Sequence, residues 1–155
     1  MLTPLRKKKI RRSLGSFAII ASRYNARYVD AMVAAAKDTL KQAGAKKIRV
    51  IRVPGAFEIP AVAARLAGAE PPWSALICLG VILRGQTSHA QLIAEAVSIA
   101  LAQLQTNRAV PVIHEVLLLE NEAQAAARCL GRQHNRGAEA AQTALEMERI
   151  MESLR

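Results

Sequence analysis

The chain has 155 residues and a formal net charge of +10; hydrophobic residues make up 52% of it and aromatic residues only 3%. This length suits one domain, whose core must be built largely from Ala, Val, Ile and Leu. No apolar run approaches the ~20 residues of a membrane-spanning helix, and the basic start lacks the apolar stretch of a signal peptide, so we expect a cytoplasmic protein without a membrane partner.

Much of the positive charge lies at the start of the chain, where six Lys and Arg residues stand within residues 1–12. We expect residues 1–14 to form a flexible basic arm and residues 15–155 to form the single domain. Such an arm binds polyanions non-specifically. Because no aromatic residues interleave with its charges to stack on bases, we expect no specific nucleic-acid recognition.

The remaining chain alternates between strand and helix patterns, which are distinguished by the spacing of their apolar residues. This alternation predicts an α/β fold, a three-layer α/β/α sandwich with a four-stranded parallel sheet of flavodoxin-like type. In chain order, we expect a strand at 16–21, a helix at 27–43, a strand at 47–53, a helix at 58–66, a strand at 75–83, a helix at 89–105, a strand at 110–117, a helix from 121 to about 130 and a last helix from about 137.

Ligands of such sheets bind beyond the carboxyl ends of the strands. There, the polar turn of residues 84–88 leads directly into the helix that begins at His89. Backbone N–H groups of Gly85, Gln86 and Thr87 and the positive end of the helix dipole would form an anion cradle. This place favours a neutral His89 imidazole, which can move protons beside a bound anion. The alternatives are an ordinary N-capped helix and a surface histidine.

Other candidate residues leave two interpretations open. Tyr24 either fills the edge of the core or stacks on a flat heterocycle. Glu58, which follows Phe57 at a helix entry, either complements the helix dipole or accepts hydrogen bonds from ligand hydroxyls. Arg128, late in its helix, is either a C-terminal cation or a fork-like donor to phosphate. The two cysteines lack metal-like spacing, so we expect core thiols and no metal site.

Taken together, these segments resemble the 6,7-dimethyl-8-ribityllumazine synthase family. The resemblance covers about residues 15–152 and keeps the order and spacing of the family's motifs. Its most specific parts are a proline–glycine–x–aromatic–glutamate motif and an arginine–glycine–x–threonine–x–histidine motif. The matching segments are 23–25, 53–60, 79–89, 110–113, 120–125 and 135–137, together with the position of Arg128.

The resemblance implies the penultimate step of riboflavin synthesis, without cofactor or metal. That step condenses 5-amino-6-(D-ribitylamino)uracil with 3,4-dihydroxy-2-butanone 4-phosphate and releases phosphate and water. His89 would shuttle protons, and Tyr24 would stack on the pyrimidine. The other implied site residues are the backbone of Val81, Ile82 and Leu83 at the pyrimidine edge, Ala56, Phe57 and Glu58 along the ribityl chain, and Gln86, Thr87 and Arg128 at the phosphate.

The resemblance also implies an assembly, because the family forms pentamers with active sites between subunits, and some members close into sixty-subunit shells. We expect a homopentamer in which His89 and Arg128 converge on a pocket shared by adjoining subunits; free pentamers and shells both stay open. The family's product passes to riboflavin synthase, which makes that enzyme an expected transfer partner.

Two departures from the family concern the same assembly. His114 stands where an aromatic side chain from the neighbouring subunit usually covers the heterocycle, so we predict weaker or more pH-dependent pyrimidine binding. Arg132, His134 and Arg136 stand where the family often has lysines and a glycine, in the bend that affects assembly. The rival interpretations are a non-catalytic flavin- or lumazine-binding protein and a polyanion-binding shell protein that acts through its basic arm.

Overall fold

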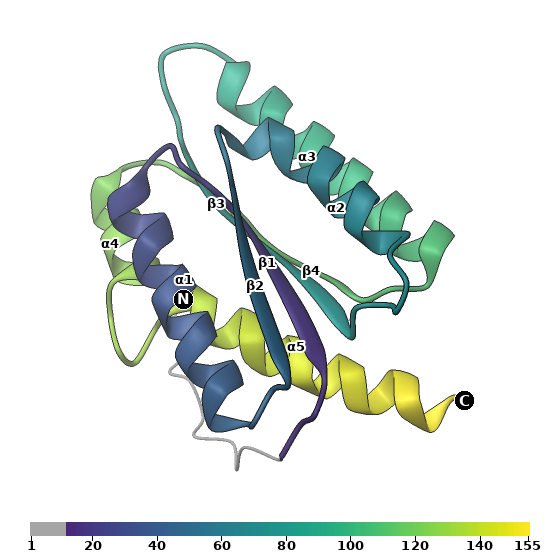
Figure 1. Ribbon diagram of the computed structural model, residues 1–155. Helices are drawn as coiled ribbons and strands as arrows, with labels where there is room; N and C mark the ends of the chain where they lie inside the picture. The colour runs from purple at the N-terminus through teal and green to yellow at the C-terminus, as the bar shows by residue number, and fades with distance from the viewer. Residues whose placement is uncertain (1–11) are drawn as a thin grey trace.

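Four parallel strands form the centre of the fold in the computed structural model, which describes residues 12–155 (Figure 1). They are β1 (Ser16–Ser22), β2 (Lys47–Val53), β3 (Ala75–Leu83) and β4 (Val112–Leu119), and their order in the sheet is β2-β1-β3-β4. The central strands β1 and β3 are buried along almost their whole length, as strands covered on both faces must be. The predicted α/β fold with its four-stranded parallel sheet is confirmed, and the strand order is of the flavodoxin-like type.

Helices cover both faces of this sheet (Figure 1). Helices α1 (Ala26–Gln42), α4 (Glu122–Cys129) and α5 (Arg136–Ser153) pack on one face, while α2 (Ile59–Ala67) and α3 (His89–Arg108) pack on the other. Because side chains alternate along a strand, β1 contributes Phe17 and Ile19 to the first core and Ala18 and Ile20 to the second. The sheet therefore separates α3 from α4.

Three elements differ from the sequence prediction by more than a single end residue. Helix α3 continues to Arg108, three residues beyond its predicted end at 105. Strand β4 begins and ends two residues later than predicted, since Pro111 has no N–H to donate and the paired run continues to Leu119, opposite Leu83. The helix predicted at 58–66 is divided into a short 3₁₀ helix, η1 (Ala56–Glu58), and α2. The Glu58 carboxylate accepts a hydrogen bond from the Gly55 N–H at 3.0 Å, which closes this first turn.

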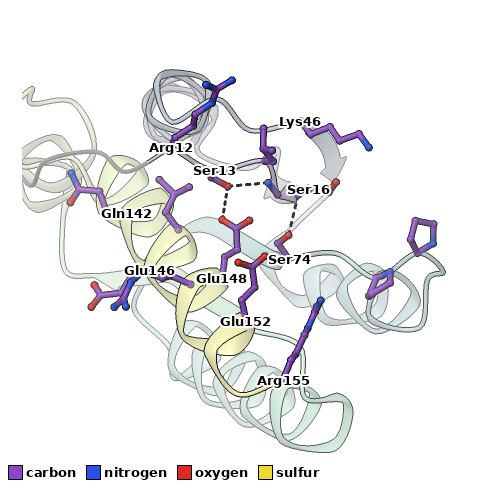
Figure 2. Close-up of a pocket in the computed structure, with 16 residues that line it drawn as sticks. Arg12, Ser13, Ser16, Lys46, Ser74, Gln142, Glu146, Glu148, Glu152 and Arg155 are labelled. Atoms are coloured by element: carbon purple, nitrogen blue, oxygen red, sulfur yellow. Dashed lines mark hydrogen bonds between the residues drawn. The ribbon is translucent and has the colours of Figure 1, made fainter.

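A cavity of about 1030 Å³ lies between the amino ends of β1, β2 and β3 and helix α5 (Figure 2). Its lining includes Ser13, Lys46, Ser74 and Glu148, and the Ser13 hydroxyl donates to the Glu148 carboxylate. None of the site residues predicted above is among the described residues that line it. Residues 1–11 of the expected arm lie outside the described residues, whereas Ser13 is buried and its N–H donates to Ala43 O. No helix in residues 12–155 is both long and apolar enough to cross a membrane.

Candidate functional site

The loops after β1 and β2 are joined at the carboxyl edge of the sheet. The N–H of Tyr24 donates to Pro54 O at 3.2 Å, which lays one loop against the other. Gly55 lies beneath both candidate side chains: a Cβ there would stand 3.0 Å from Glu58 Oε2 and 3.0 Å from two ring atoms of Tyr24. The Tyr24 ring and the Glu58 carboxylate are therefore brought together around one glycine. The Tyr24 side chain is available to a ligand, because the residue is 69% exposed.

Phe57 completes the exposed aromatic surface here, with 62% of its area accessible. It belongs to η1, which packs against α3. Large exposed aromatic residues on a chain with so few of them indicate a binding or assembly surface. The structure therefore favours contact with a ligand or a second subunit over burial in the core for Tyr24 and Phe57.

Asn25 is a site-supporting residue that the sequence analysis did not single out. It adopts a left-handed backbone conformation with φ of 58°, and its Nδ2 donates to Val81 O at 2.7 Å. This bond fixes the loop after β1 to the end of β3, where Val81 is buried and Ile82 and Leu83 are half-buried. An Asn just before a helical pattern is the signal that would have indicated it, since Asn tolerates this conformation.

The loop between β3 and α3 is exposed from Arg84 to His89. Ser88 precedes α3 without a side-chain cap hydrogen bond, and Thr87 Oγ1 accepts from the His89 N–H at 3.3 Å. The first turn of a helix has backbone N–H groups without intrahelical partners. With so little side-chain capping, the start of α3 keeps N–H groups that can face an anion, as the cradle requires.

His114 is held in one tautomer by its hydrogen bonds. Its Nδ1 accepts from the Val116 N–H at 3.0 Å, and its Nε2 lies 2.7 Å from Ser98 Oγ. Ser98 donates its own hydroxyl proton to Ala94 O, so Nε2 must carry the proton shared with Ser98. Partial burial lowers the pKa of His114 below its ordinary value. The ring is thus neutral at pH 7 and tied to α3.

Arg128 lies on the other side of the sheet from His89, because α4 and α3 cover opposite faces (Figure 1). Its Nη1 donates to Gln124 O, one turn earlier in α4, at 3.5 Å. A single chain therefore brings Tyr24, Gly55 and Glu58 together. Arg128 is instead hydrogen-bonded within α4, and His114 is hydrogen-bonded to the middle of α3.

Glu115 is a second residue that sequence analysis missed. Burial raises its pKa to about 7, an effect that Arg136 on α5 opposes and Glu139 on α5 reinforces. It also raises the pKa of the nearby Cys129 thiol, whose own burial is the larger cause of a value of about 11. A glutamate in a strand of mostly apolar residues was the available signal, and its partners on α5 were not readable from the sequence.

Neither cysteine belongs to a metal site in the described part of the chain. Both thiols are buried, and burial raises the pKa of Cys78 to about 12. Within residues 12–155, no group of three or more His, Cys, Asp or Glu side chains is placed to hold a metal ion. The thiols pack in the two cores on either side of the sheet.

Comparison with known proteins identifies close relatives along nearly the whole chain. The sequence profile of the 6,7-dimethyl-8-ribityllumazine synthase family matches residues 15–152. A protein of that name from Stenotrophomonas maltophilia (strain R551-3) is 44% identical over 140 residues, which are 89% of this chain and 90% of the relative. Another of that name, from Xanthomonas euvesicatoria pv. vesicatoria (strain 85-10), is 42% identical over 147 residues, 94% of this chain and 95% of the relative.

Proposed function

The chain belongs to the 6,7-dimethyl-8-ribityllumazine synthase family, and we propose that it condenses 5-amino-6-(D-ribitylamino)uracil with 3,4-dihydroxy-2-butanone 4-phosphate. It is an enzyme of the transferase class, in riboflavin biosynthesis. The observation that carries the choice of substrates is the grouping of the Tyr24 ring and the Glu58 carboxylate around Gly55, at the sheet edge where α3 begins. A flat ring with a polyhydroxylated chain needs such a stacking surface beside an acceptor.

In this proposal the pyrimidine stacks on Tyr24, and backbone groups of 81–83 hold its edge. Ala56, Phe57 and Glu58 line the ribityl chain, with Glu58 accepting from its hydroxyls. The phosphate lies at the start of α3, held by N–H groups of Gln86 and Thr87, where the helix dipole favours an anion. Arg128 of a neighbouring subunit supplies a fork of donors to the same phosphate.

His89 performs the proton transfers. The substrate amine attacks the ketone, and loss of water gives an imine; elimination then expels phosphate. The ribityl-bearing nitrogen finally attacks the remaining carbonyl, and loss of a second water closes the ring. Each of these steps moves a proton, and the imidazole at the start of α3 can accept and return it. No nucleophilic side chain is needed, because holding two reactants in contact itself supplies much of the rate gain.

The exposed apolar face of α3 supports assembly into a homopentamer. Leu92 and Ile99 are 61% and 59% exposed and stand two turns apart on one face, with exposed Ala96 between them. A second copy of the chain would cover this face and bring Arg128 and His114 to the neighbour's site. Riboflavin synthase would take up the product. A free pentamer and a sixty-subunit shell are both compatible with the short 130–135 bend.

The test is to mix the protein with both substrates and follow the absorbance of the lumazine product. We expect turnover by the unmodified chain and, in His89→Ala, a loss of about 10²–10⁴-fold in kcat with little change in either KM. Asn107→Ala, at the far end of α3, is the matched control and should keep full activity. Tight binding of a lumazine analogue without turnover would instead identify a non-catalytic binding protein. Polyanion binding that disappears with residues 1–12, in a chain without synthase activity, would support the arm-based alternative.

A further inference from the structure

Arg84, the first residue after β3, is hydrogen-bonded to β4, to α3 and to the segment before α4. Its N–H donates to Leu119 O at 2.9 Å, at the end of β4. Its Nε donates to Glu120 Oε1 at 2.6 Å, and its Nη2 donates to Gln91 Oε1 at 2.6 Å, in the first turn of α3. The two sides of one guanidinium thus join the start of α3 to the segment that leads into α4.

The chain of hydrogen bonds continues on the α4 side. The Glu120 N–H donates to Gln124 Oε1 at 2.9 Å, and Arg128 donates to the carbonyl oxygen of the same Gln124 at 3.5 Å. A continuous path therefore runs from the first turn of α3, across the end of the sheet, to Arg128 of the same chain, which in the proposed assembly serves the neighbouring subunit's phosphate site. It crosses between helices that lie on opposite faces (Figure 1).

The loop that follows Arg84 has few restraints of its own. Residues 85–88 are exposed, and a Cβ on Gly85 would meet no atom within 4 Å. A loop that binds phosphate through backbone N–H groups must nevertheless hold them in one geometry, because ordering the loop at the moment of binding would cost conformational entropy. The restraint must come from the two ends of the loop. Arg84 stands at the first end, and its side chain is hydrogen-bonded to Gln91 of α3, the helix that begins at the second end.

We propose that Arg84 is a positioning residue that ties the 85–88 loop and the first turn of α3 to the segment before α4 in the same chain, so that the N–H groups of this loop are preformed for phosphate. This inference rests on the proposed function, in which that loop takes the phosphate. The effect is geometric, since the Arg84 and Glu120 side chains are 39% and 59% exposed and such an ion pair adds little stability. A lysine cannot replace the planar fork, which serves two acceptors in fixed directions.

The test compares Arg84→Gln, Arg84→Lys, Glu120→Gln and the double variant Arg84→Gln/Glu120→Gln with the unmodified enzyme. We expect the KM for the butanone phosphate to rise about 3–10-fold in Arg84→Gln, with the KM for the pyrimidine and the melting temperature nearly unchanged. Arg84→Lys should rescue only part of this loss, and the double variant should be little worse than Arg84→Gln, because both changes break one path. Arg108→Gln, at the other end of α3, is the control.

Hydrogen–deuterium exchange gives a readout that needs no activity. In Arg84→Gln we expect faster exchange in both the 85–92 and the 120–128 segments. Full rescue by lysine would overturn the proposal, because charge alone would then suffice; so would equal rises in both KM values, or exchange that changes in one segment only. If the unmodified chain proves inactive while both segments still respond, the proposed function fails and the structural coupling stands.

Discussion

Gly55 is restricted by space and not by its backbone conformation, which is extended with φ of −131°. Since a Cβ would stand 3.0 Å from both the Tyr24 ring and Glu58 Oε2, Gly55→Ala must push the two ligand-facing groups apart by a few tenths of an ångström. We expect the KM for the pyrimidine to rise about 3–10-fold while the melting temperature changes by less than about 4 °C.

Gly68→Ala is the matched control for this substitution, because its Cβ would meet no atom closer than 3.9 Å. Steady-state kinetics with each substrate varied in turn gives a separate KM for the pyrimidine and for the butanone phosphate in each variant. An unchanged pyrimidine KM in Gly55→Ala would show that Tyr24 and Glu58 do not bind that substrate.

His114 carries the pH dependence expected from the family comparison, and the structure gives its direction. The pKa of the folded ring is lowered by burial, so the neutral form persists as pH falls, until protonation at Nδ1 breaks the bond from the Val116 N–H. We therefore expect affinity for a lumazine analogue to be constant above about pH 7 and to fall below the ordinary histidine pKa of ~6.5.

The comparison is with His114→Phe, which has no titrating group and should give a flat profile between pH 5 and 8. Ser98→Ala removes the hydroxyl that accepts from Nε2 and leaves the ring itself in place. It should keep a pH-dependent profile, whereas identical curves for the unmodified protein and His114→Phe would show that the ring does not contact the ligand.

At the scale of elements, the crossing of α1 and α5 depends on Gly137. A Cβ there would stand 2.0 Å from Met32 O, and the obstructing atoms belong to the α1 backbone, which cannot move aside like a side chain. We expect Gly137→Ala to lower the free energy of unfolding by about 3 kcal/mol, the upper end for overpacking. Urea denaturation measures it, and a loss below about 0.5 kcal/mol, typical of surface sites, would contradict this packing.

Strand β4 also carries Glu115, a carboxyl group whose pKa is raised by burial. Its folded pKa of about 7 exceeds the unfolded value, so folding binds a proton between roughly pH 4.5 and 7, and stability falls as pH rises through this window. Glu115→Gln removes this pH-dependent loss of stability. We expect its melting temperature to exceed that of the unmodified protein by about 2–4 °C at pH 8 and to match it near pH 4.

Calorimetry at several pH values makes this comparison. Glu148 also has a raised pKa, caused mainly by burial, so part of the fall at high pH should persist in Glu115→Gln. Equal pH profiles for the two proteins would mean that Glu115 is not the proton-binding group.

Periodicity predicted all four strands and all five α-helices of the described residues, because burial on one or both faces leaves a direct pattern in the sequence. It did not predict the short helix η1. The ends of elements were less predictable. The shift of β4 depends on the pairing of Leu119 with Leu83, a contact between distant residues. The supporting hydrogen bonds of Asn25 and Arg84 and the charged neighbours of Glu115 were missed for the same reason: each of these interactions joins elements whose relative placement only the folded chain defines.

At the scale of the whole molecule, the sheet divides the candidate site residues. Tyr24, Glu58 and His89 follow the carboxyl ends of β1, β2 and β3, whereas Arg128 is carried by α4, in the helix layer on the face opposite to α3 (Figure 1). If Arg128 and His89 act on one phosphate, as proposed, they must come from different subunits. Assembly is then a condition of activity and not merely of stability.

This condition leads to a prediction about α3. Ile99→Glu would place a charge on the apolar face formed with Leu92 and Ala96, and burying an unpaired charge between subunits costs several kcal/mol. We expect analytical ultracentrifugation to give the unmodified protein a mass of at least about five times the 16.8 kDa chain, and Ile99→Glu a mass near that of one chain. Leu154→Glu, which changes an even more exposed apolar residue just past the end of α5, should leave the mass unchanged. Synthase activity should fall together with mass in Ile99→Glu; a single chain with full activity would contradict both the shared site and the role of Arg128.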